Sequence, residues 1–426
     1  MNNKIIFSFL LLIFVKQFSY SQQMPAISPN ELAYHTLKAK GYLAAIDTLL
    51  KTDSLYIKSP YKSVYFQMVS TYYSFVGNRS KADEFYDRMF DINIKDKVVK
   101  KLDSVDIPVN VSPFSAKDFI IQKAKEGEKV IMINEAHYKS HHRILTNSVL
   151  KELYEQGFRY LALEALADDS LLVQRKYPLV MKSGFYTNEP MYGNMIREAL
   201  KLGYTLIGYD YDGVCDFNSA SPNYCKNVRE IGQAKNLQQI ILQDKNAKIL
   251  VHAGYGHIRE TPEGDWLKMA DIFKILTGIN PLTIDQTSLS EKSNLLFENP
   301  YTDYFIQKFQ FKEPIILLNQ DKTVWTSPKR KGYDAQVVFP RDINGALQVL
   351  LPSYQKFMIP KKHLKKGNFI QFFATSETAE AVPINQIVVE DTQKDVMVFL
   401  PKGEFNVKVT ESAKISTTYS FTAKIE

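Results

Sequence analysis

The central part of the chain alternates short apolar runs with longer stretches in which apolar residues recur at helical spacing. This alternation is typical of strand–helix units that build a mostly parallel sheet. Each run is short, as expected of strands that are buried on both faces. We therefore predict an α/β domain over residues 113–290, with strands at the apolar runs Val130–Ile133, Tyr160–Leu163, Thr205–Gly208, Ile249–Val251 and Leu282–Ile284.

A helix is predicted between the first two runs, from His142 to Gln156. Apolar residues recur along it at spacings of three and four, which places them on one face of a helix. Gly157 follows directly and is a typical helix stop. The residues of the apolar face are Ile144, Leu145, Val149, Leu150 and Leu153.

The flanking regions have different patterns. Residues 22–112 have helical spacing, and Ser28-Pro29-Asn30-Glu31 offers a capping residue, a proline at the first helical position and a glutamate at the third. The segment from Tyr72 to Tyr86 is similar to one tetratricopeptide hairpin. One hairpin is too little for a solenoid, because each repeat buries its apolar face against neighbours, so we expect a helical cap on the next domain.

The C-terminal part changes again. Residues 291–334 are predicted to form an extension or linker, and residues 335–426 a β-rich domain. Its clearest strands, Phe405–Thr410 and Tyr419–Ile425, alternate apolar and polar positions as half-buried strands do. We expect a small sandwich.

The N-terminus predicts export. The apolar run Ile5–Val15 follows Lys4, and the small residues Ser19 and Ser21 precede Gln22, which is the pattern of a secretory signal peptide over residues 1–21. The run is shorter than the roughly 20 residues that span a bilayer, and no later segment resembles a transmembrane helix. The expected location of the mature protein is the periplasm or the extracellular space.

Composition narrows the class of partner. The 426 residues carry a net charge of +7, and the densest basic segment, Lys361–Lys366, is short. A nucleic-acid partner is therefore not expected. The two cysteines, Cys215 and Cys225, lie in a polar loop, and in an oxidising compartment they could form a disulfide.

Chemistry is expected where the strands end, because ligands of open α/β sheets bind beyond the carboxyl ends of the strands. Each predicted strand is followed there by histidine or a carboxylate. For single residues a structural role remains open: His252 could be a hydrogen-bonded histidine at a buried strand end, and His137 a surface residue like His141 and His142. In strand order, the candidates are Glu135 and His137, Glu164, Asp210 and Asp212, His252 and His257, and Asp285.

The order of these motifs resembles a known superfamily. Asn134-Glu135-Ala136-His137, Glu164 and Gly254-Tyr255-Gly256-His257 look like the motifs shared by ChaN-like haem-uptake proteins, the Tiki and TraB group, and the erythromycin esterases. Asn134 stands where Tiki and TraB members have glycine. Arg229, Ala234 and Asn236 are similar to a helical pattern of the esterases. The resemblance covers residues 129–287 and implies the α/β fold predicted above.

The first functional hypothesis is a hydrolase of ester or amide bonds acting on a small molecule or peptide. His137 would be the base, Glu135 or Glu164 its partner, Arg229 with His252 the electrophilic side, and His257 would complete the site. In a second version His137, Glu164 and His257 would bind a divalent transition metal, a ligand set that leaves a position open for water.

Two other hypotheses remain open. A haem- or iron-binding protein of ChaN-like type would ligate iron through a histidine or through Tyr138 or Tyr255. A non-catalytic envelope protein would use its flanking regions for partner contacts.

Overall fold

The computed structural model describes residues 25–90, 99, 102–103, 106–211, 213–216, 219, 221–328, 330–391, 395–411 and 418–426. The predicted signal peptide and Asp212 lie outside these ranges.

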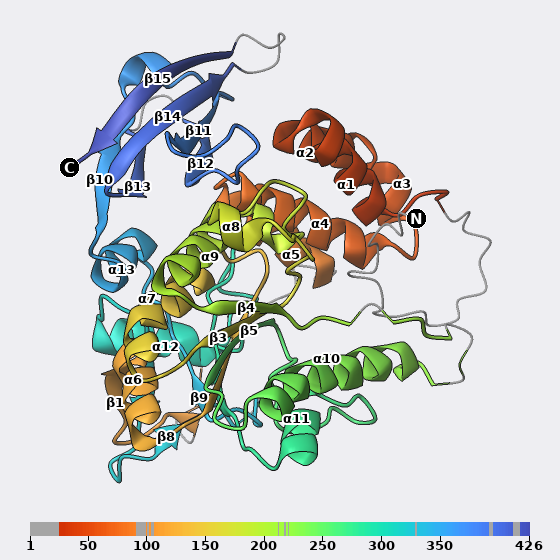
Figure 1. Ribbon diagram of the computed structural model, residues 1–426, viewed down its shortest axis with the longest axis vertical. Helices are drawn as coiled ribbons and strands as arrows, with labels where there is room; N and C mark the ends of the chain where they lie inside the picture. The colour runs from red at the N-terminus through yellow and green to blue at the C-terminus, as the bar shows by residue number, and fades with distance from the viewer. Residues whose placement is uncertain are drawn as a thin grey trace.

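A six-stranded parallel sheet forms the centre of the molecule (Figure 1). Its order is β4-β3-β5-β2-β6-β9, so the strands of the predicted site, β3, β5 and β2, are neighbours in the middle. The prediction of an α/β fold with a mostly parallel sheet is confirmed. The strands are β2 (Val130–Glu135), β3 (Tyr160–Leu163), β4 (Thr205–Gly208), β5 (Ile249–Gly254), β6 (Leu282–Asp285) and β9 (Ala335–Gln336).

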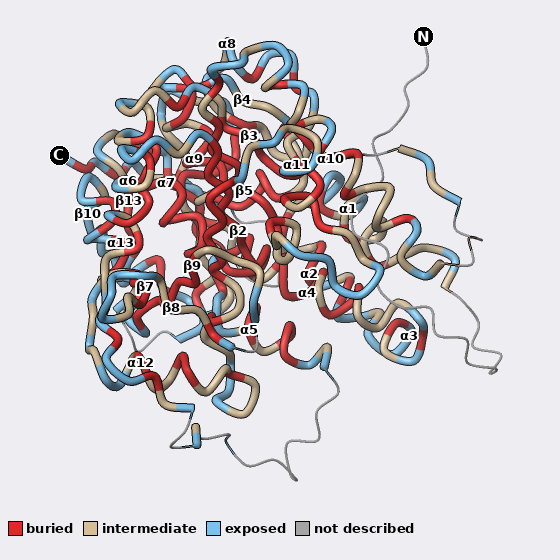
Figure 2. Tube along the Cα trace, turned by 90° about the horizontal axis from the view of Figure 1, so that it is seen from below, coloured by how far each residue is buried: buried red, intermediate tan, exposed pale blue. Residues whose placement is uncertain are grey.

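Helices cover both faces of this sheet. On one face α6 (Ala116–Glu126), α7 (His142–Glu155) and α9 (Pro190–Leu202) lie against Ile131 and Ile133 of β2. On the other face α10 (Tyr224–Gln243) and α11 (Met269–Thr277) pack on the alternate residues Val130 and Met132. Successive side chains of a strand point to opposite faces, so one apolar run supplies both cores. Figure 2 shows the buried strands between partly exposed helices.

The N-terminal helices form a separate small core. They are α1 (Pro29–Lys40), α2 (Tyr42–Lys51), α3 (Asp53–Ile57), α4 (Lys62–Phe75) and α5 (Arg79–Asp87), followed by η1 (Arg88–Phe90). The predicted capping box at Ser28 and Glu31 is present. Apolar residues of these helices pack together with Phe369 of the C-terminal region. The helical N-terminal region is thereby joined to the opposite end of the chain.

Residues 335–426 contain the antiparallel sheets that their alternating pattern predicted, and a further antiparallel sheet is built from residues 112–115 and 315–325. β1 (Ser112–Ser115), β7 (Ile315–Leu318) and β8 (Val324–Trp325) form one sheet. β10 (Tyr354–Met358) pairs with β13 (Met397–Pro401), and β12-β11-β14-β15 form another sheet that shares a core with this pair. The remaining elements are β11 (Phe369–Ala374), β12 (Asn385–Val388), β14 (Gly403–Thr410), β15 (Thr418–Ile425), α8 (Leu172–Arg175), η4 (Tyr186–Asn188), α12 (Pro300–Phe309), α13 (Ile343–Leu350) and η5 (Lys361–His363).

The turn between α4 and α5 meets β12 (Figure 1). Gln386 of β12 donates its side-chain amide to the carbonyl of Phe75 at 2.6 Å, and Asn78 donates to Glu390 at 2.6 Å. Gly77 lies between these bonds at φ +73°, and a Cβ there would be 2.4 Å from the carbonyl oxygen of Gln386. The contact therefore requires glycine.

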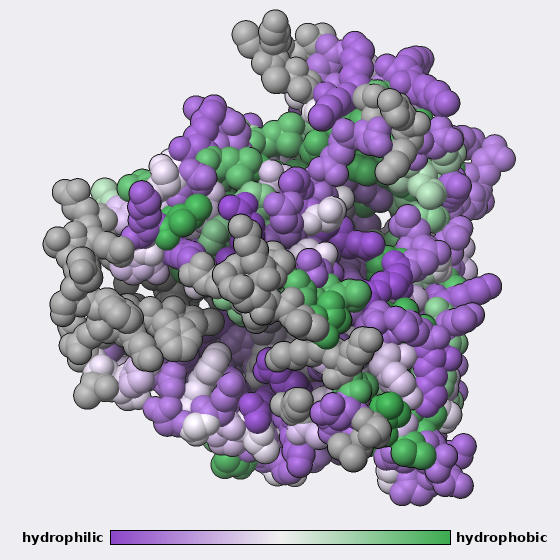
Figure 3. Space-filling view, turned by 180° about the vertical axis from the view of Figure 1, so that it is seen from behind, coloured by the Kyte–Doolittle hydropathy of each residue, from purple (hydrophilic) through white to green (hydrophobic). Residues whose placement is uncertain are grey.

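The outer surface carries both polar and apolar side chains. On the face drawn in Figure 3, hydrophilic side chains predominate and apolar ones form separate patches. Among the described residues, none of the helices combines the length and apolarity needed to cross a bilayer.

Replacing Gly77 by alanine should destabilise the fold. The side chain would combine a left-handed backbone with a backbone clash, so we expect a loss of about 3 kcal/mol or more in unfolding free energy, measured by urea denaturation. Gly278→Ala is the matched control, because Gly278 has a left-handed backbone with φ +71° but open space around it. Its expected loss is about 1 kcal/mol, and equal losses at both positions would contradict the role of the Gln386 contact.

Candidate active site

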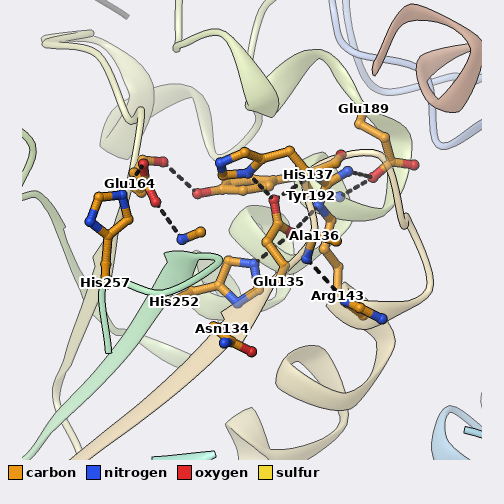
Figure 4. A network of polar contacts seen from close by, with 12 residues as sticks. Asn134, Glu135, Ala136, His137, Arg143, Glu164, Glu189, Tyr192, His252 and His257 are labelled. Atoms are coloured by element: carbon orange, nitrogen blue, oxygen red, sulfur yellow. Dashed lines mark hydrogen bonds and ion pairs between the residues drawn. The ribbon is translucent and has the colours of Figure 1, made fainter. Parts of the chain in front are cut away.

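The middle strands bring the candidate residues together (Figure 4). Glu135 ends β2, His252 lies in β5, and Glu164 follows β3. In the sheet, His252 is paired with Ile133 on one side and Leu163 on the other. Because the three strands are parallel neighbours, their carboxyl ends meet at one edge, as the sequence predicted.

Glu135 is the centre of a buried network and is 1% exposed. Its carboxylate accepts hydrogen bonds from the Nε and Nη2 atoms of Arg143 at 2.6 and 2.7 Å, and lies 2.9 Å from both His137 Nδ1 and His252 Nε2. These contacts match the roughly four acceptor positions of a carboxylate. Burial alone would raise the pKa of Glu135, but Arg143 and His252 outweigh it and hold the pKa well below its usual range.

Arg143, in the first turn of α7, was not predicted from the sequence. Its side chain is fully buried, and it also donates to Glu189 at 2.8 Å and to the carbonyl of His137 at 2.8 Å. A buried arginine is compensated only when acids and carbonyls surround it. The available signal was an arginine eight residues after Glu135, in the first turn of a predicted helix whose other face is apolar.

His137 lies above the end of β5. Its ring stacks on Tyr186 with centroids 3.7 Å apart, and Tyr255 contacts it edge-on at 5.0 Å. With Nδ1 directed to the Glu135 carboxylate, which can only accept, Nε2 carries the lone pair. Among the described residues, no hydrogen-bond partner of Nε2 is found. This nitrogen is therefore free to accept a proton.

Gly254 makes the close approach possible. A Cβ at this position would be 2.3 Å from His137 Nε2 and 2.9 Å from Glu164 Oε2. The next residue, Tyr255, has φ +42°, and Ala165, directly after Glu164, has φ +60°. Non-glycine residues with positive φ are uncommon and concentrate at functional sites.

His252 is placed differently from its predicted role. Its Nδ1 lies 3.0 Å from the hydroxyl of Thr146 and its Nε2 contacts Glu135, and the side chain is 1% exposed. Both ring nitrogens are occupied, so His252 orients Glu135 and cannot offer a free N–H to a substrate. The structure therefore corrects the expectation that His252 belongs to the electrophilic side.

A second cluster surrounds Arg229 of α10. Arg229 donates to Glu164 at 2.6 Å and to Asp210 at 3.1 and 3.0 Å, and its Nη1 lies 3.0 Å from His257 Nε2. His257 in turn contacts Glu230 through Nδ1 at 2.9 Å. The side chain of Arg229 is 28% exposed, more than any other member of the cluster. This cluster forms the solvent-facing side of the site.

The charges of this cluster depend on one another. Burial opposes ionisation of Glu164, but His257 and Arg229 outweigh it and lower the pKa of Glu164 to about 2. Burial likewise opposes protonation of His257, yet Glu230 and Glu164 raise its pKa. Burial, reinforced by Glu164, raises the pKa of Asp210 although Arg229 opposes this.

Other predicted positions have structural roles. Asp285 accepts a hydrogen bond from Asn134 at 2.8 Å, and Asn134 also donates to the carbonyl of Tyr255 at 2.6 Å. Asn134 thus braces the loop that carries His257. His141 and His142, expected at the start of a helix, are buried there rather than on the surface.

The tyrosines considered for iron form an aromatic stack. Tyr138 stacks on Tyr86 of α5 at 4.0 Å, and Tyr255 lies on Tyr86 at 6.2 Å. Burial, followed by the neighbouring tyrosines, raises the pKa of Tyr138 and Tyr255 well above the usual range. The hydroxyl of Tyr138 accepts a hydrogen bond from Lys292 at 3.1 Å, and haem ligation through either tyrosine stays a prediction.

The proposed metal ligands also have other partners. Glu164 and His257 both contact the Arg229 guanidinium, which places a fixed cation between them. In the part of the chain that the structure describes, no three His, Cys, Asp or Glu side chains are grouped to hold a metal ion. The set of His137, Glu164 and His257 therefore does not fit a metal.

No family model matches the chain, and no curated protein matches it. Among solved structures, the type III effector HopBA1 is similar with a TM-score of 0.29 and 16% identity, covering 42% of this chain and 88% of the effector. A TM-score this low carries no argument. The superfamily resemblance stays a prediction.

The low pKa of Glu164 predicts a pH-dependent stability. A depressed folded-state pKa stabilises the fold above the ordinary value of 4.5, and this contribution is lost as pH falls towards about 2. Glu164→Gln should lower the free energy of unfolding by roughly 2–4 kcal/mol at neutral pH. The difference in unfolding free energy between this variant and wild type should shrink as the pH falls from 4.5 to 2. Chemical denaturation across this range measures it. Exposed Glu155 provides the control Glu155→Gln, and a pH-independent difference for Glu164→Gln would contradict the assignment.

Proposed function

We propose that the protein is a hydrolase of ester or amide bonds that activates water with His137 and uses no metal. The observation that carries this proposal is the His137 dyad. Nδ1 lies 2.9 Å from Glu135, which Arg143 holds by two hydrogen bonds, and Nε2 has no partner among the described residues. A histidine held in this way is poised to act as a general base.

In the proposed reaction His137 Nε2 takes a proton from water as the oxygen attacks the carbonyl carbon. Glu135 accepts a hydrogen bond from the Nδ1–H group and stabilises the imidazolium that forms. The tetrahedral intermediate then collapses, and the leaving alcohol or amine receives the proton from His137. The products are a carboxylic acid and the alcohol or amine, so atoms and protons balance.

The negative charge that develops on the carbonyl oxygen needs a donor. Arg229 is the partly exposed cation of the site, and Glu164 and Asp210 fix its guanidinium by three hydrogen bonds. A donor fixed in advance stabilises a transition state without reorganising, which supports assigning Arg229 to the oxyanion. His257, 3.0 Å from Arg229, positions the same group.

The small-molecule or peptide substrate and the superfamily membership remain part of this proposal. The site residues match, in order, the motifs that resemble the ChaN-like, Tiki and erythromycin esterase proteins. Among the described residues, no serine or cysteine is found in contact with His137, which supports direct attack by water.

Substituting His137 by glutamine should abolish turnover. A panel of activated esters and amides is first assayed with wild type to find a substrate. On that substrate we expect the His137→Gln variant to lose at least about 10³-fold in kcat/KM, since the base and the nucleophilic water act as a unit. Glu135→Gln should lose about 10²-fold or more and shift the pH profile, because the Nδ1–H loses its charged acceptor.

His363→Gln is the control for these variants. His363 is a buried histidine in the C-terminal region, where it contacts Tyr419 at 2.9 Å, and its substitution should leave kcat/KM unchanged. Wild-type activity in a correctly folded His137→Gln protein would overturn the proposal. Loss of activity on removal of divalent metal by a chelator would contradict the metal-free mechanism.

We also propose that the protein is exported. The predicted signal peptide lies outside the described residues, and support comes from the disulfide between Cys215 and Cys225, with Cα atoms 5.4 Å apart. Disulfides persist in oxidising compartments. Expression in a bacterium should give a mature chain that begins at Gln22, as determined by N-terminal sequencing. An intact Met1 terminus in the cytoplasm would contradict export.

A further inference from the structure

One face of the His137 ring is covered by Tyr186. The two ring centroids are 3.7 Å apart and the ring planes differ by 13°, which is a closer stack than any other ring pair found among the described residues. Tyr186 lies in η4, in the connection between β3 and α9, and it belongs to none of the site motifs of the sequence. The reaction proposed above assigns it no role.

The turn that carries Tyr186 is held from several sides. Gly184, two residues earlier, has φ +139°, and a Cβ there would clash with the backbone of the preceding loop. Asn188 donates its side-chain amide to the carbonyls of Gly184 and Phe185 at 3.0 and 2.6 Å. Tyr42 of α2 donates to the carbonyl of Asn188 at 3.0 Å. The N-terminal helices therefore help to fix this turn.

Tyr186 meets His137 with the face of a neutral ring. Burial, reinforced by Glu164, raises the pKa of Tyr186 well above its usual range, so the phenol keeps its proton. The face of such a ring carries partial negative charge and attracts a cation that lies over it. The attraction is stronger where water is excluded, and here Tyr186 is 1% and His137 6% exposed.

The His137 ring becomes such a cation when Nε2 takes a proton. The stack on Tyr186 therefore stabilises the imidazolium more than the neutral imidazole. The same contact limits rotation of the ring, which keeps Nδ1 2.9 Å from the Glu135 carboxylate (Figure 4). Both effects favour the state that follows proton transfer.

We propose that Tyr186 is a positioning residue of the His137 site: the face of its ring holds the imidazole against Glu135 and stabilises the imidazolium that forms when His137 takes a proton from water. This proposal rests on the hydrolase mechanism given above and adds a residue to it. It also gives the N-terminal helices a role at the site, since they help to fix the turn that carries Tyr186.

The charged groups around His137 are the same in every variant of Tyr186. Glu135 contacts Nδ1, Arg143 donates to the carbonyl of His137, and Glu164 interacts electrostatically with the ring. Tyr255 contacts the ring edge-on. A change in the protonation of His137 that follows substitution of Tyr186 therefore reports the loss of the stacked ring.

Tyr186→Leu should weaken the base. We expect kcat/KM to fall about tenfold through kcat, with KM little changed, because the imidazolium has lost a stabilising contact. The acid limb of the kcat/KM profile should move to lower pH by about half a unit to one unit. Tyr186→Phe keeps the ring and should retain the wild-type rate and profile. A loss in Tyr186→Phe equal to that in Tyr186→Leu would assign the role to the hydroxyl and overturn the proposal.

A second series preserves the shape of the buried ring, since leucine leaves space there. Phenylalanine analogues with increasing fluorine substitution are incorporated at position 186 in the full chain. Fluorine withdraws negative charge from the ring face, so kcat/KM should fall stepwise as fluorines are added. A constant rate across folded members of the series would overturn the proposal.

Phe421→Leu is the matched control. Phe421 of β15 stacks on His363 of η5 with centroids 4.4 Å apart. This substitution removes a ring stacked on a histidine outside the site, so the rate and pH profile of hydrolysis should be unchanged.

A readout that needs no turnover separates this proposal from the hydrolase. Histidine ring signals of the full chain are followed by NMR across pH, and the signal of His137 is the one absent from His137→Gln. The midpoint of its protonation should move to lower pH in Tyr186→Leu and stay in place in Tyr186→Phe. This shift in a chain that hydrolyses no substrate would support the stacked imidazolium and overturn the hydrolase. Turnover with an unchanged midpoint in Tyr186→Leu would overturn the role of Tyr186 alone.

Discussion

The buried pair of Glu135 and Arg143 is the constraint on which the rest of the site depends. A carboxylate at the end of a buried strand is costly unless cations or N–H groups satisfy it. Arg143 of α7 donates to the Glu135 carboxylate and also to Glu189 at the start of α9. The ion pair therefore fixes the first turns of two helices against the end of β2, and it fixes the carboxylate that orients His137 and His252.

The site is consequently built in two parts with different roles. The inner part, around Glu135, is buried and rigid, and each of its polar groups has a partner except His137 Nε2 among the described residues. The outer part, around Arg229, is partly exposed and balances acids against one guanidinium and His257. In the proposed mechanism this division separates His137, which would accept a proton, from Arg229, which would meet the developing negative charge.

The flanking regions do more than cover the central sheet. Tyr86 of α5 stacks against Tyr138 and Tyr255 beside His137, so a helix of the N-terminal region contributes to the wall of the site. Gly77 meets β12, which joins the same helices to the C-terminal sheet. A cavity lined by residues of all three regions is a consequence of this arrangement.

The strands, the parallel sheet and the edge that carries the candidate site could be predicted from the chain alone, because apolar runs and the polar residues that end them are local patterns. The same patterns also placed Glu135, His137, Glu164 and His257 at that edge. The packing of helices on strand ends was needed to reveal that Arg143 and Arg229 compensate the acids, that His252 is enclosed, and that Arg229 lies between Glu164 and His257, two of the expected metal ligands. These outcomes depend on which helix packs on which strand end, and long-range contacts of that kind leave no periodic signal in a single chain.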